Sequence, residues 1–129
     1  MIDDSETNLY LIKSVFKNRG DILVFTESIG RRTLETVKKI TPEIILLDLM
    51  MPDIDGFRLL DQLKSSSAFR KIPVVILSAI HEDEIVAKTK QMGAVGYIKK
   101  PVDIDEVEEI INRLLKDNKS SSPSERTVL

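Results

Sequence analysis

Five side chains in this 129-residue sequence are of the kinds that bind phosphate and divalent cations: Asp3, Asp4, Asp48, Ser78 and Lys100. Three carboxylates gathered in one place repel one another unless a cation joins them, and hard oxygen ligands suit Mg²⁺. A carboxylate there can attack a phosphoryl group whose oxygens are neutralised by Mg²⁺ and an ammonium, and a hydroxyl can donate to those oxygens. The residue types therefore fit phosphoryl transfer to Asp48, provided that the fold brings them together.

The segment around Asp48 indicates how the fold could do so. It reads IILLDLMMPDIDG over residues 44–56, and its four leading aliphatic residues show no polar alternation. Such a run is typical of a parallel strand that is covered on both faces, and ligands of open α/β sheets bind at the carboxyl ends of the strands. Pro52 and Gly56 predict a loop that leads into a helix near Phe57.

The rest of the chain alternates between strand and helix patterns. Helices are predicted over 5–19, 31–40, 57–64, 82–92 and 104–117, and strands over 22–25, 44–47, 74–77 and 97–98. Asp103 and Glu106 resemble a capping box at the start of the last helix. This alternation predicts an α/β fold with a doubly wound parallel sheet and right-handed crossovers.

Four places put a reactive side chain at a strand's carboxyl end: Asp3 with Asp4, Asp48, Ser78 and Lys100. All four are expected to converge on one crevice. Each residue also has a structural explanation: an Asp at a strand end is often a turn or cap residue, a Ser a turn former, and a Lys before Pro a surface residue. Coincidence at all four exits has odds of roughly one in ten by this reasoning. Tyr97 is either a half-buried strand aromatic or a switch residue.

Composition limits the class of protein. With 42% hydrophobic and 31% charged residues, the chain is expected to be one folded domain over residues 1–117, followed by a flexible, Ser-rich tail or linker over 118–129. The absence of cysteine excludes disulfides and thiolate metal sites. We expect a cytoplasmic protein with no membrane segment and no secretory signal. A net charge of −2 argues against direct nucleic-acid binding.

From Asp3 to about Leu115 the sequence resembles a response-regulator receiver domain of two-component signalling. The phosphate-handling residues have the spacing of that family: 45 residues from Asp3 to Asp48 (48 − 3), 30 to Ser78 (78 − 48) and 52 from Asp48 to Lys100 (100 − 48). The segments LDLMMPDIDG, LSA, GAVGY and KP resemble the family pattern in place and order. The resemblance implies a flavodoxin-like (βα)5 fold with strand order 2-1-3-4-5, the order shared by flavodoxin and a chemotaxis receiver.

The resemblance also implies roles for individual residues. Asp48 would accept the phosphoryl group, Ser78 and Lys100 would hold it, and Ser78 with Tyr97 would act as the switch. Mg²⁺ would be bound by the side chains of Asp3, Asp4 and Asp48 and by the backbone carbonyl of Met50.

Partners follow from the same resemblance. A sensor histidine kinase or a histidine phosphotransfer protein would supply the phosphoryl group, and an output protein or effector domain would bind the fourth helix, fifth strand and fifth helix. The domain would be a regulatory phosphoacceptor, not an enzyme in its own right, that assists its own phosphorylation and slow self-dephosphorylation. We expect a long-lived phosphoryl group, because Met50 and Ile80, two residues beyond Asp48 and Ser78, are apolar and cannot position an attacking water.

Three other functions have weaker support in the sequence. A flavodoxin-like small-molecule binder would need a Gly- or Ser/Thr-rich phosphate loop, which the sequence lacks. A phosphohydrolase with an aspartyl nucleophile would be expected to carry an acid at position 50, where this chain has Met50. A phosphorylation-independent pseudo-receiver, whose pocket serves only as an interaction surface, is disfavoured by the intact acids and lysine.

One departure from the family pattern concerns the first strand. Only Met1 and Ile2 precede the acidic pair, where receivers have a full apolar strand. A truncated first strand would leave two interior sheet edges unpaired. We therefore expect either strand-forming residues upstream or a strand-exchanged or associated dimer.

Overall fold

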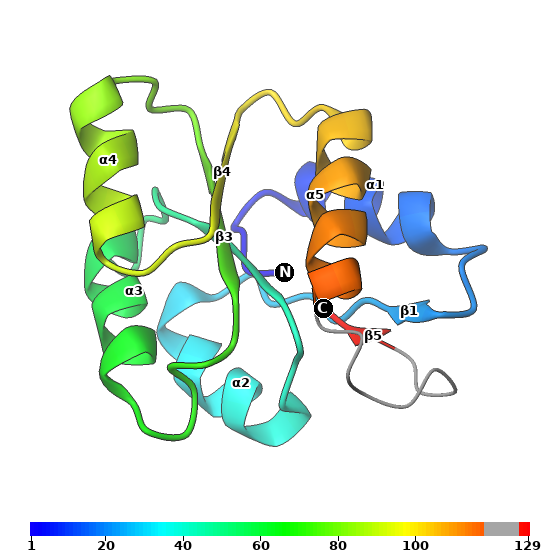
Figure 1. The fold of residues 1–129 in the computed structure, drawn as a ribbon, viewed down its shortest axis with the longest axis horizontal. Helices are drawn as coiled ribbons and strands as arrows, with labels where there is room; N and C mark the ends of the chain where they lie inside the picture. The colour runs from blue at the N-terminus through cyan, green and yellow to red at the C-terminus, as the bar shows by residue number, and fades with distance from the viewer. Residues whose placement is uncertain (118–126) are drawn as a thin grey trace.

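Apolar strands form the centre of the molecule, which is described by a computed structural model over residues 1–117 and 127–129 (Figure 1). Strands β2 (Ile45–Asp48) and β3 (Val74–Ser78) are buried at every residue. They pair in parallel, and β4 (Gly96–Lys99) pairs in parallel with the other edge of β3. The resulting order is β2-β3-β4. The predicted parallel sheet is confirmed, with strand bounds that differ from the prediction by at most one residue.

Helices cover both faces of this sheet because successive strand residues point to opposite sides. Leu46, Val75 and Leu77 face a core cluster that also holds the buried faces of α1 (Glu6–Phe16) and α5 (Ile104–Asp117). The alternate strand residues face a second cluster, packed against α2 (Thr33–Ile40), α3 (Gly56–Ser65) and α4 (Asp83–Gln91). Figure 1 shows the same division, with α1 and α5 on one side of the strands and α2, α3 and α4 on the other.

Local signals in the sequence set the ends of these helices. Ser5 caps α1 by accepting a hydrogen bond from the Asn8 amide, and Asp55 caps α3 by accepting one from the Phe57 amide. The turn after α4 needs Gly93, whose φ of 106° is a conformation that residues with a Cβ rarely adopt. Each of the five predicted helices is present, so the predicted α/β alternation is confirmed. A short 3₁₀ helix, η1 (Gly30–Arg32), precedes α2 and was not predicted.

The predicted strand over 22–25 is shorter than expected. Only Ile22–Leu23 form a regular strand, β1, and the chain then runs on through Phe25 to Glu27. Met1 to Asp3 lie between this segment and β2, with Ile2 bridged to Glu27 on one side and to Leu47 on the other. Ile2 donates to the Leu46 carbonyl at 2.7 Å and accepts from the Asp48 amide at 2.9 Å. The truncated first strand therefore occupies the place that the order 2-1-3-4-5 requires.

The end of the chain departs from the predicted tail. Residues 118–126 lie outside the described residues, but Thr127–Val128 form a strand, β5, that pairs in parallel with β1. The Glu43 and Ile44 amides donate to the Val128 carbonyl, at 2.7 and 3.3 Å. The expectation that truncation leaves both interior edges unpaired is thus wrong, because Ile2 bridges to both sides and the last three residues bond to β1 and to the amides just before β2. The domain boundary itself stays a prediction.

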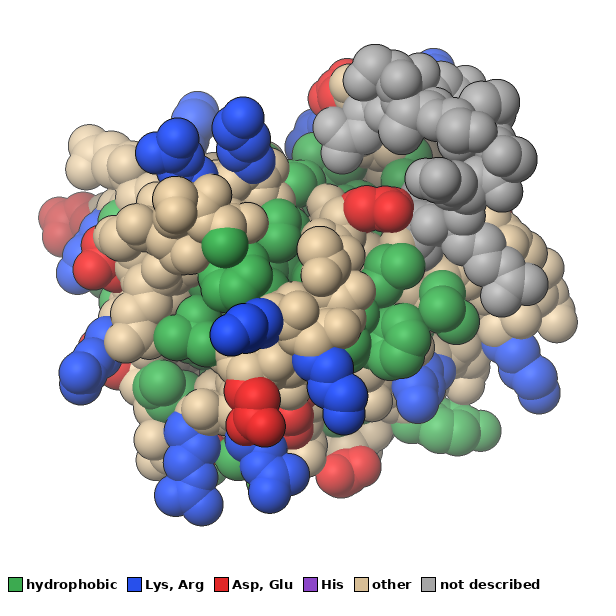
Figure 2. All heavy atoms as spheres, turned by 90° about the horizontal axis from the view of Figure 1, so that it is seen from below, with side chains coloured by type: hydrophobic (Ala, Val, Ile, Leu, Met, Phe, Trp, Pro, Cys, Tyr) green, Lys and Arg blue, Asp and Glu red, His purple; other side chains and the backbone are tan. Residues whose placement is uncertain are grey.

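The surface bears on two further expectations. Among the described residues, no helix is both long and apolar enough to cross a membrane. On the face shown in Figure 2, Lys and Arg side chains are scattered among acidic ones and around apolar side chains, and do not form a continuous basic patch. The predictions of a cytoplasmic location and of no direct nucleic-acid contact stay predictions.

Candidate functional site

Three of the five candidate site residues lie at the carboxyl ends of neighbouring strands. Asp48 is the last residue of β2, Ser78 is the last residue of β3, and Lys100 directly follows β4. The Leu49 amide donates to the Leu77 carbonyl at 3.1 Å, and the Lys100 amide donates to the Ser78 carbonyl at 2.8 Å. Because the strands are parallel and in register, the sheet brings these side chains to one edge.

Asp3 reaches the same edge from the truncated first strand, although it is far from the other residues in sequence. Its amide donates to the Glu27 carbonyl at 3.1 Å, which continues the pairing begun at Ile2. Its side chain is fully buried and accepts from the Ser5 amide at 2.9 Å and from Asn8 Nδ2 at 3.1 Å. These bonds fix the carboxylate in one orientation.

Lys100 joins the two buried carboxylates. Its Nζ lies 3.1 Å from Asp3 Oδ2 and 3.2 Å from Asp48 Oδ2. Burial alone would lower the pKa of Lys100, but its contacts with Asp3 and Asp48 outweigh burial and raise the pKa above the ordinary lysine value. The ammonium is therefore charged at neutral pH and offsets part of the negative charge beside it.

One ammonium leaves the site short of positive charge. Burial, with a smaller contribution from the charge of Asp3, raises the pKa of Asp48 to about 6, while the Met50 amide and Lys100 act in the opposite direction. Asp48 Oδ1 accepts from the Met50 amide at 3.1 Å. Asp48 Oδ2 is buried and has no aligned hydrogen bond from the described residues, although Lys100 forms an ion pair with it. That oxygen is the least satisfied polar atom of the site.

The acidic cluster has the composition of a Mg²⁺ site. Carboxylate oxygens of Asp3, Asp4 and Asp48 lie within 4.8 Å of one another, and Asp4 is exposed while the other two are buried. Hard oxygen ligands with an open, solvent-facing side suit a cation that keeps several of its waters. Asp48 Oδ2, which lacks an aligned hydrogen bond within the described part of the chain, also favours a cation at this position. These residues therefore fit a Mg²⁺ ion.

The loop after β3 connects Ser78 to Tyr97. Ser78 is fully buried, and its Oγ accepts from the Ile80 amide at 3.0 Å. Tyr97, half-buried in β4, donates its hydroxyl to the Ile80 carbonyl at 2.8 Å. Ile80 thus makes one bond with each of the two residues that the family resemblance assigns to switching.

Two supporting residues, Asn8 and Asp53, were not identified from the sequence, and Gly56 was assigned to the loop after Asp48 without its packing role. Asn8 donates to Asp3, and its position in the first turn of α1, five residues after Asp3, is a signal that the sequence offers. Asp53 accepts from the Gly30 and Arg31 amides, at 3.3 and 3.0 Å, and so ties the loop after β2 to η1. Gly56 is required for packing, because a Cβ there would clash with the Leu49 backbone.

The sequence that builds this geometry matches a known family. Residues 1–112 match the family described as the response regulator receiver domain. The chain belongs to this family.

Individual relatives agree with that assignment. The receiver domain is 30% identical over 115 residues to sporulation initiation phosphotransferase F of Bacillus subtilis, a match that covers 89% of this chain and 90% of the relative. It is also 30% identical over 115 residues to the DNA-binding transcriptional regulator NtrC of Escherichia coli, covering 89% of this chain but 24% of that protein. Among solved structures, the receiver domain of the Francisella response regulator 1452 is 31% identical with a TM-score of 0.82, covering 91% and 94% of the two chains.

These matches establish a response-regulator receiver domain of two-component signalling with a flavodoxin-like fold. Domains of this family are regulatory phosphoacceptors and bind Mg²⁺ at an acidic pocket. The relatives differ in what accompanies the receiver: the chain spans most of the Bacillus protein but about a quarter of NtrC.

The pKa of Asp48 gives a direct test of this electrostatic description. In the Mg²⁺-free receiver domain, the Asp48 carboxyl should titrate near pH 6, because burial and Asp3 disfavour its charge. Asp3→Asn should move the midpoint down and Lys100→Met should move it up, each by about one pH unit. Carboxyl-carbon NMR measures the midpoints. Asp53, whose pKa lies below the usual range because the Arg31 amide binds it, is the internal control. An Asp48 midpoint below 4 in the unmodified protein would contradict the description.

Proposed function

We propose that this receiver domain accepts a phosphoryl group on Asp48 from a histidine kinase or a histidine phosphotransfer protein. The observation that supports this most directly is the buried Asp48 Oδ2, which lies 3.2 Å from Lys100 Nζ and has no aligned hydrogen bond from the described residues. An oxygen in that state retains lone pairs for a new bond. A relative of similar length is named a phosphotransferase, which supports phosphoryl transfer by a chain of this size.

In the proposed reaction, an Asp48 carboxylate oxygen attacks phosphorus, the bond from phosphorus to the donor's imidazole nitrogen breaks, and the imidazole leaves with that electron pair. The product is an acyl phosphate on Asp48. Lys100 neutralises the phosphoryl oxygens, and the Ser78 hydroxyl donates to one of them once it turns from the Ile80 amide.

We assign Mg²⁺ to Asp3, Asp4, Asp48 and the Met50 backbone carbonyl. When bound, the cation neutralises charge on the phosphoryl oxygens and the surrounding carboxylates. The chain's own part is to hold the ligands: Ser5 and Asn8 fix Asp3, and the Met50 amide fixes Asp48 through Oδ1. Asp4 is the one exposed side chain among the three carboxylates.

We further propose that phosphorylation changes a surface built from α4, β4 and α5, which an output protein or effector domain binds. If Ser78 donates to the phosphoryl group, its bond with the Ile80 amide must change, and Ile80 carries the carbonyl to which Tyr97 donates. A change at Asp48 thereby reaches β4 through two hydrogen bonds.

The first prediction concerns the acceptor. With Mg²⁺ and acetyl phosphate, the protein should gain one phosphoryl group, and Asp48→Asn should gain none, because the site itself supplies the positioning and charge neutralisation. Intact-mass spectrometry measures both. Asp61→Asn, the same change at an exposed position on α3, is the matched control and should be phosphorylated normally. Phosphorylation of Asp48→Asn, or unchanged phosphorylation in EDTA, would overturn the assignment.

The second prediction concerns the switch. Phosphorylation should shift the NMR signals of the Tyr97 ring and the Ile80 amide, because the Ser78–Ile80–Tyr97 contacts rearrange. Ser78→Ala should still be phosphorylated, although more slowly, and should lose most of the Tyr97 shift. Tyr10, which is 75% exposed on α1, should not respond and serves as the control ring. An equal Tyr97 shift in Ser78→Ala would contradict the proposed route.

The third prediction concerns the lifetime of the phosphoryl group. Met50 is 61% exposed beside the site, and it cannot orient an attacking water. Met50→Asn and Ile80→Glu should each speed hydrolysis by about tenfold, equivalent to about 1.4 kcal/mol of barrier. Decay of the phosphorylated mass gives the rate. Val95→Asn, an exposed apolar-to-polar change outside the site, is the control. If neither variant decays faster than this control, polar groups at positions 50 and 80 do not set the lifetime.

A further inference from the structure

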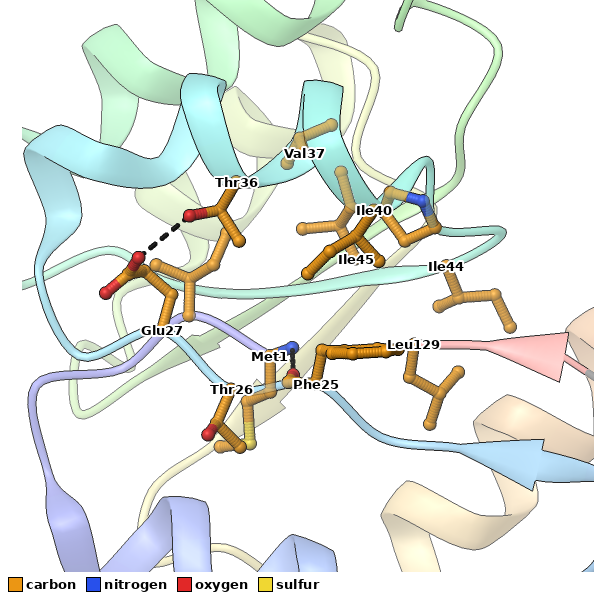
Figure 3. A pocket seen from close by; sticks show the side chains of 12 residues that line it. Met1, Phe25, Thr26, Glu27, Thr36, Val37, Ile40, Ile44, Ile45 and Leu129 are labelled. Carbon is orange, nitrogen blue, oxygen red and sulfur yellow. Dashed lines mark hydrogen bonds between the residues drawn. The ribbon is translucent and has the colours of Figure 1, made fainter.

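The two ends of the chain meet inside the sheet. Thr127 to Leu129 run parallel to β1, with Ile22 opposite Thr127 and Leu23 opposite Val128. Met1 to Asp3 follow farther along the same neighbour, and Figures 1 and 3 show the two ends side by side. Phe25 bonds to both ends: its amide donates to the Leu129 carbonyl at 3.3 Å, and its carbonyl accepts from the Met1 amino group at 2.8 Å.

The hydrogen bonds on the β1 side give the spacing between the two ends. Leu129 donates to the Leu23 carbonyl and accepts from the Phe25 amide, which places it opposite Val24. Met1 donates to the Phe25 carbonyl and accepts from the Glu27 amide, which places it two positions farther along. In a parallel ladder, residues two apart on one strand pair with residues two apart on the next. Leu129 and Met1 thus stand two positions apart, with space for one residue between them.

The β2 side is compatible with this spacing but does not fix it. The Val128 carbonyl accepts from the Glu43 amide at 2.7 Å and from the Ile44 amide at 3.3 Å, and the Ile2 carbonyl accepts from the Asp48 amide at 2.9 Å. Counted from the Ile44 bond, Val128 and Ile2 are four positions apart, which again leaves one position between Leu129 and Met1. Counted from the shorter Glu43 bond, they are five positions apart. The register is therefore set by the β1 side, where Leu129 and Met1 each donate one bond and accept one bond.

Side-chain packing is consistent with this alignment. Leu129 is 2% exposed and belongs to the core cluster that contains Met1, Phe16 and Ile22. The gap left beside Met1 and Leu129 (Figure 3) has a volume of about 20 Å³, room for about one water molecule. Leu129 therefore buries its side chain in the same core cluster as Met1, from the other end of the sequence.

We propose that the slot between β1 and β2 is a strand-acceptor site for a short, extended, apolar segment, and that its occupant is this chain's own Thr127–Leu129. Thr127–Leu129 and Met1–Asp3 together lie along the strand position between β1 and β2. The far end of this strand position carries Asp3, so occupation of the slot stabilises the segment that delivers one carboxylate to the acidic cluster.

The first experiment removes the occupant. Deleting Thr127–Leu129 should lower Tm by more than about 5 °C and raise hydrogen exchange at the Phe25 and Ile44 amides at least about tenfold, since these donate to the removed carbonyls. The Leu49 amide, which donates to Leu77, is the internal control. Leu129→Ala should lower Tm by several degrees, and Val95→Ala, at a 45% exposed position, should leave it unchanged. Unchanged Tm and exchange in both C-terminal variants would overturn the proposal.

The second experiment tests the register and does not depend on a destabilised variant. Leu129 is joined to Met1 through one valine, and new ends are opened between Ser121 and Ser122, outside the described residues. This permuted chain should fold as a monomer with a higher Tm than the original. Linkers of zero or two residues should give lower Tm values than one residue, because a one-residue slip moves every side chain of a strand to the opposite face.

Two results of this experiment would overturn the proposal. One is a permuted series in which the one-residue linker is not the most stable. The other is an original chain that is a dimer by light scattering and becomes a monomer on deletion of Thr127–Leu129, because the slot would then be filled by a second copy.

Discussion

The pairing of Lys100 with two buried carboxylates is the interaction on which the site depends. Asp3 and Asp48 are 0% and 1% exposed, and each would be costly to bury as an isolated charge. The Lys100 ammonium lies 3.1 Å from Asp3 and 3.2 Å from Asp48 and offsets part of the repulsion between the two carboxylates. One positive charge does not balance two negative ones, so the site still lacks positive charge. That residual deficit leaves Asp48 with a raised pKa and an incompletely bonded oxygen. The oxygen that is least stabilised by the fold, Asp48 Oδ2, is therefore also the one that is free to form a new bond.

Much of the fold and of the site could be predicted because the relevant signals are local or repeat along the chain. The apolar runs before Asp48 and Ser78 have no helical periodicity, so they specify strands buried on both faces and place those residues at strand ends. The helix faces were predicted from spacing, as with the buried Leu9, Ile12 and Phe16 of α1. Once strands are parallel, convergence of their carboxyl ends follows from geometry alone.

The remainder depends on contacts between residues distant in sequence. Asp53 is an ordinary polar residue until the fold brings the Gly30 amide to it, 23 residues away in sequence. The sequence TVL at 127–129 has strand propensity, but it follows a polar, Ser-rich run, and no local feature indicates a slot beside Met1. The short segment before Asp3 was visible in the sequence. The pairing of Thr127–Leu129 with β1 was not, because register is a property of the assembled sheet.

The buried amino group of Met1 makes folding exchange protons with the solvent. Burial lowers its pKa from 8.0 to about 5, so at neutral pH the unfolded chain holds a proton that the folded chain releases. Acidification from pH 8 to pH 5 therefore destabilises the fold through this group, by up to about 4 kcal/mol at about 1.4 kcal/mol per pH unit. Asp48 acts in the opposite sense: its raised pKa makes the cation-free folded state take up a proton below about pH 6, so acidification between pH 6 and pH 4 stabilises the fold. Release and uptake cancel between pH 5 and pH 6, where these two groups together give the cation-free domain its lowest stability.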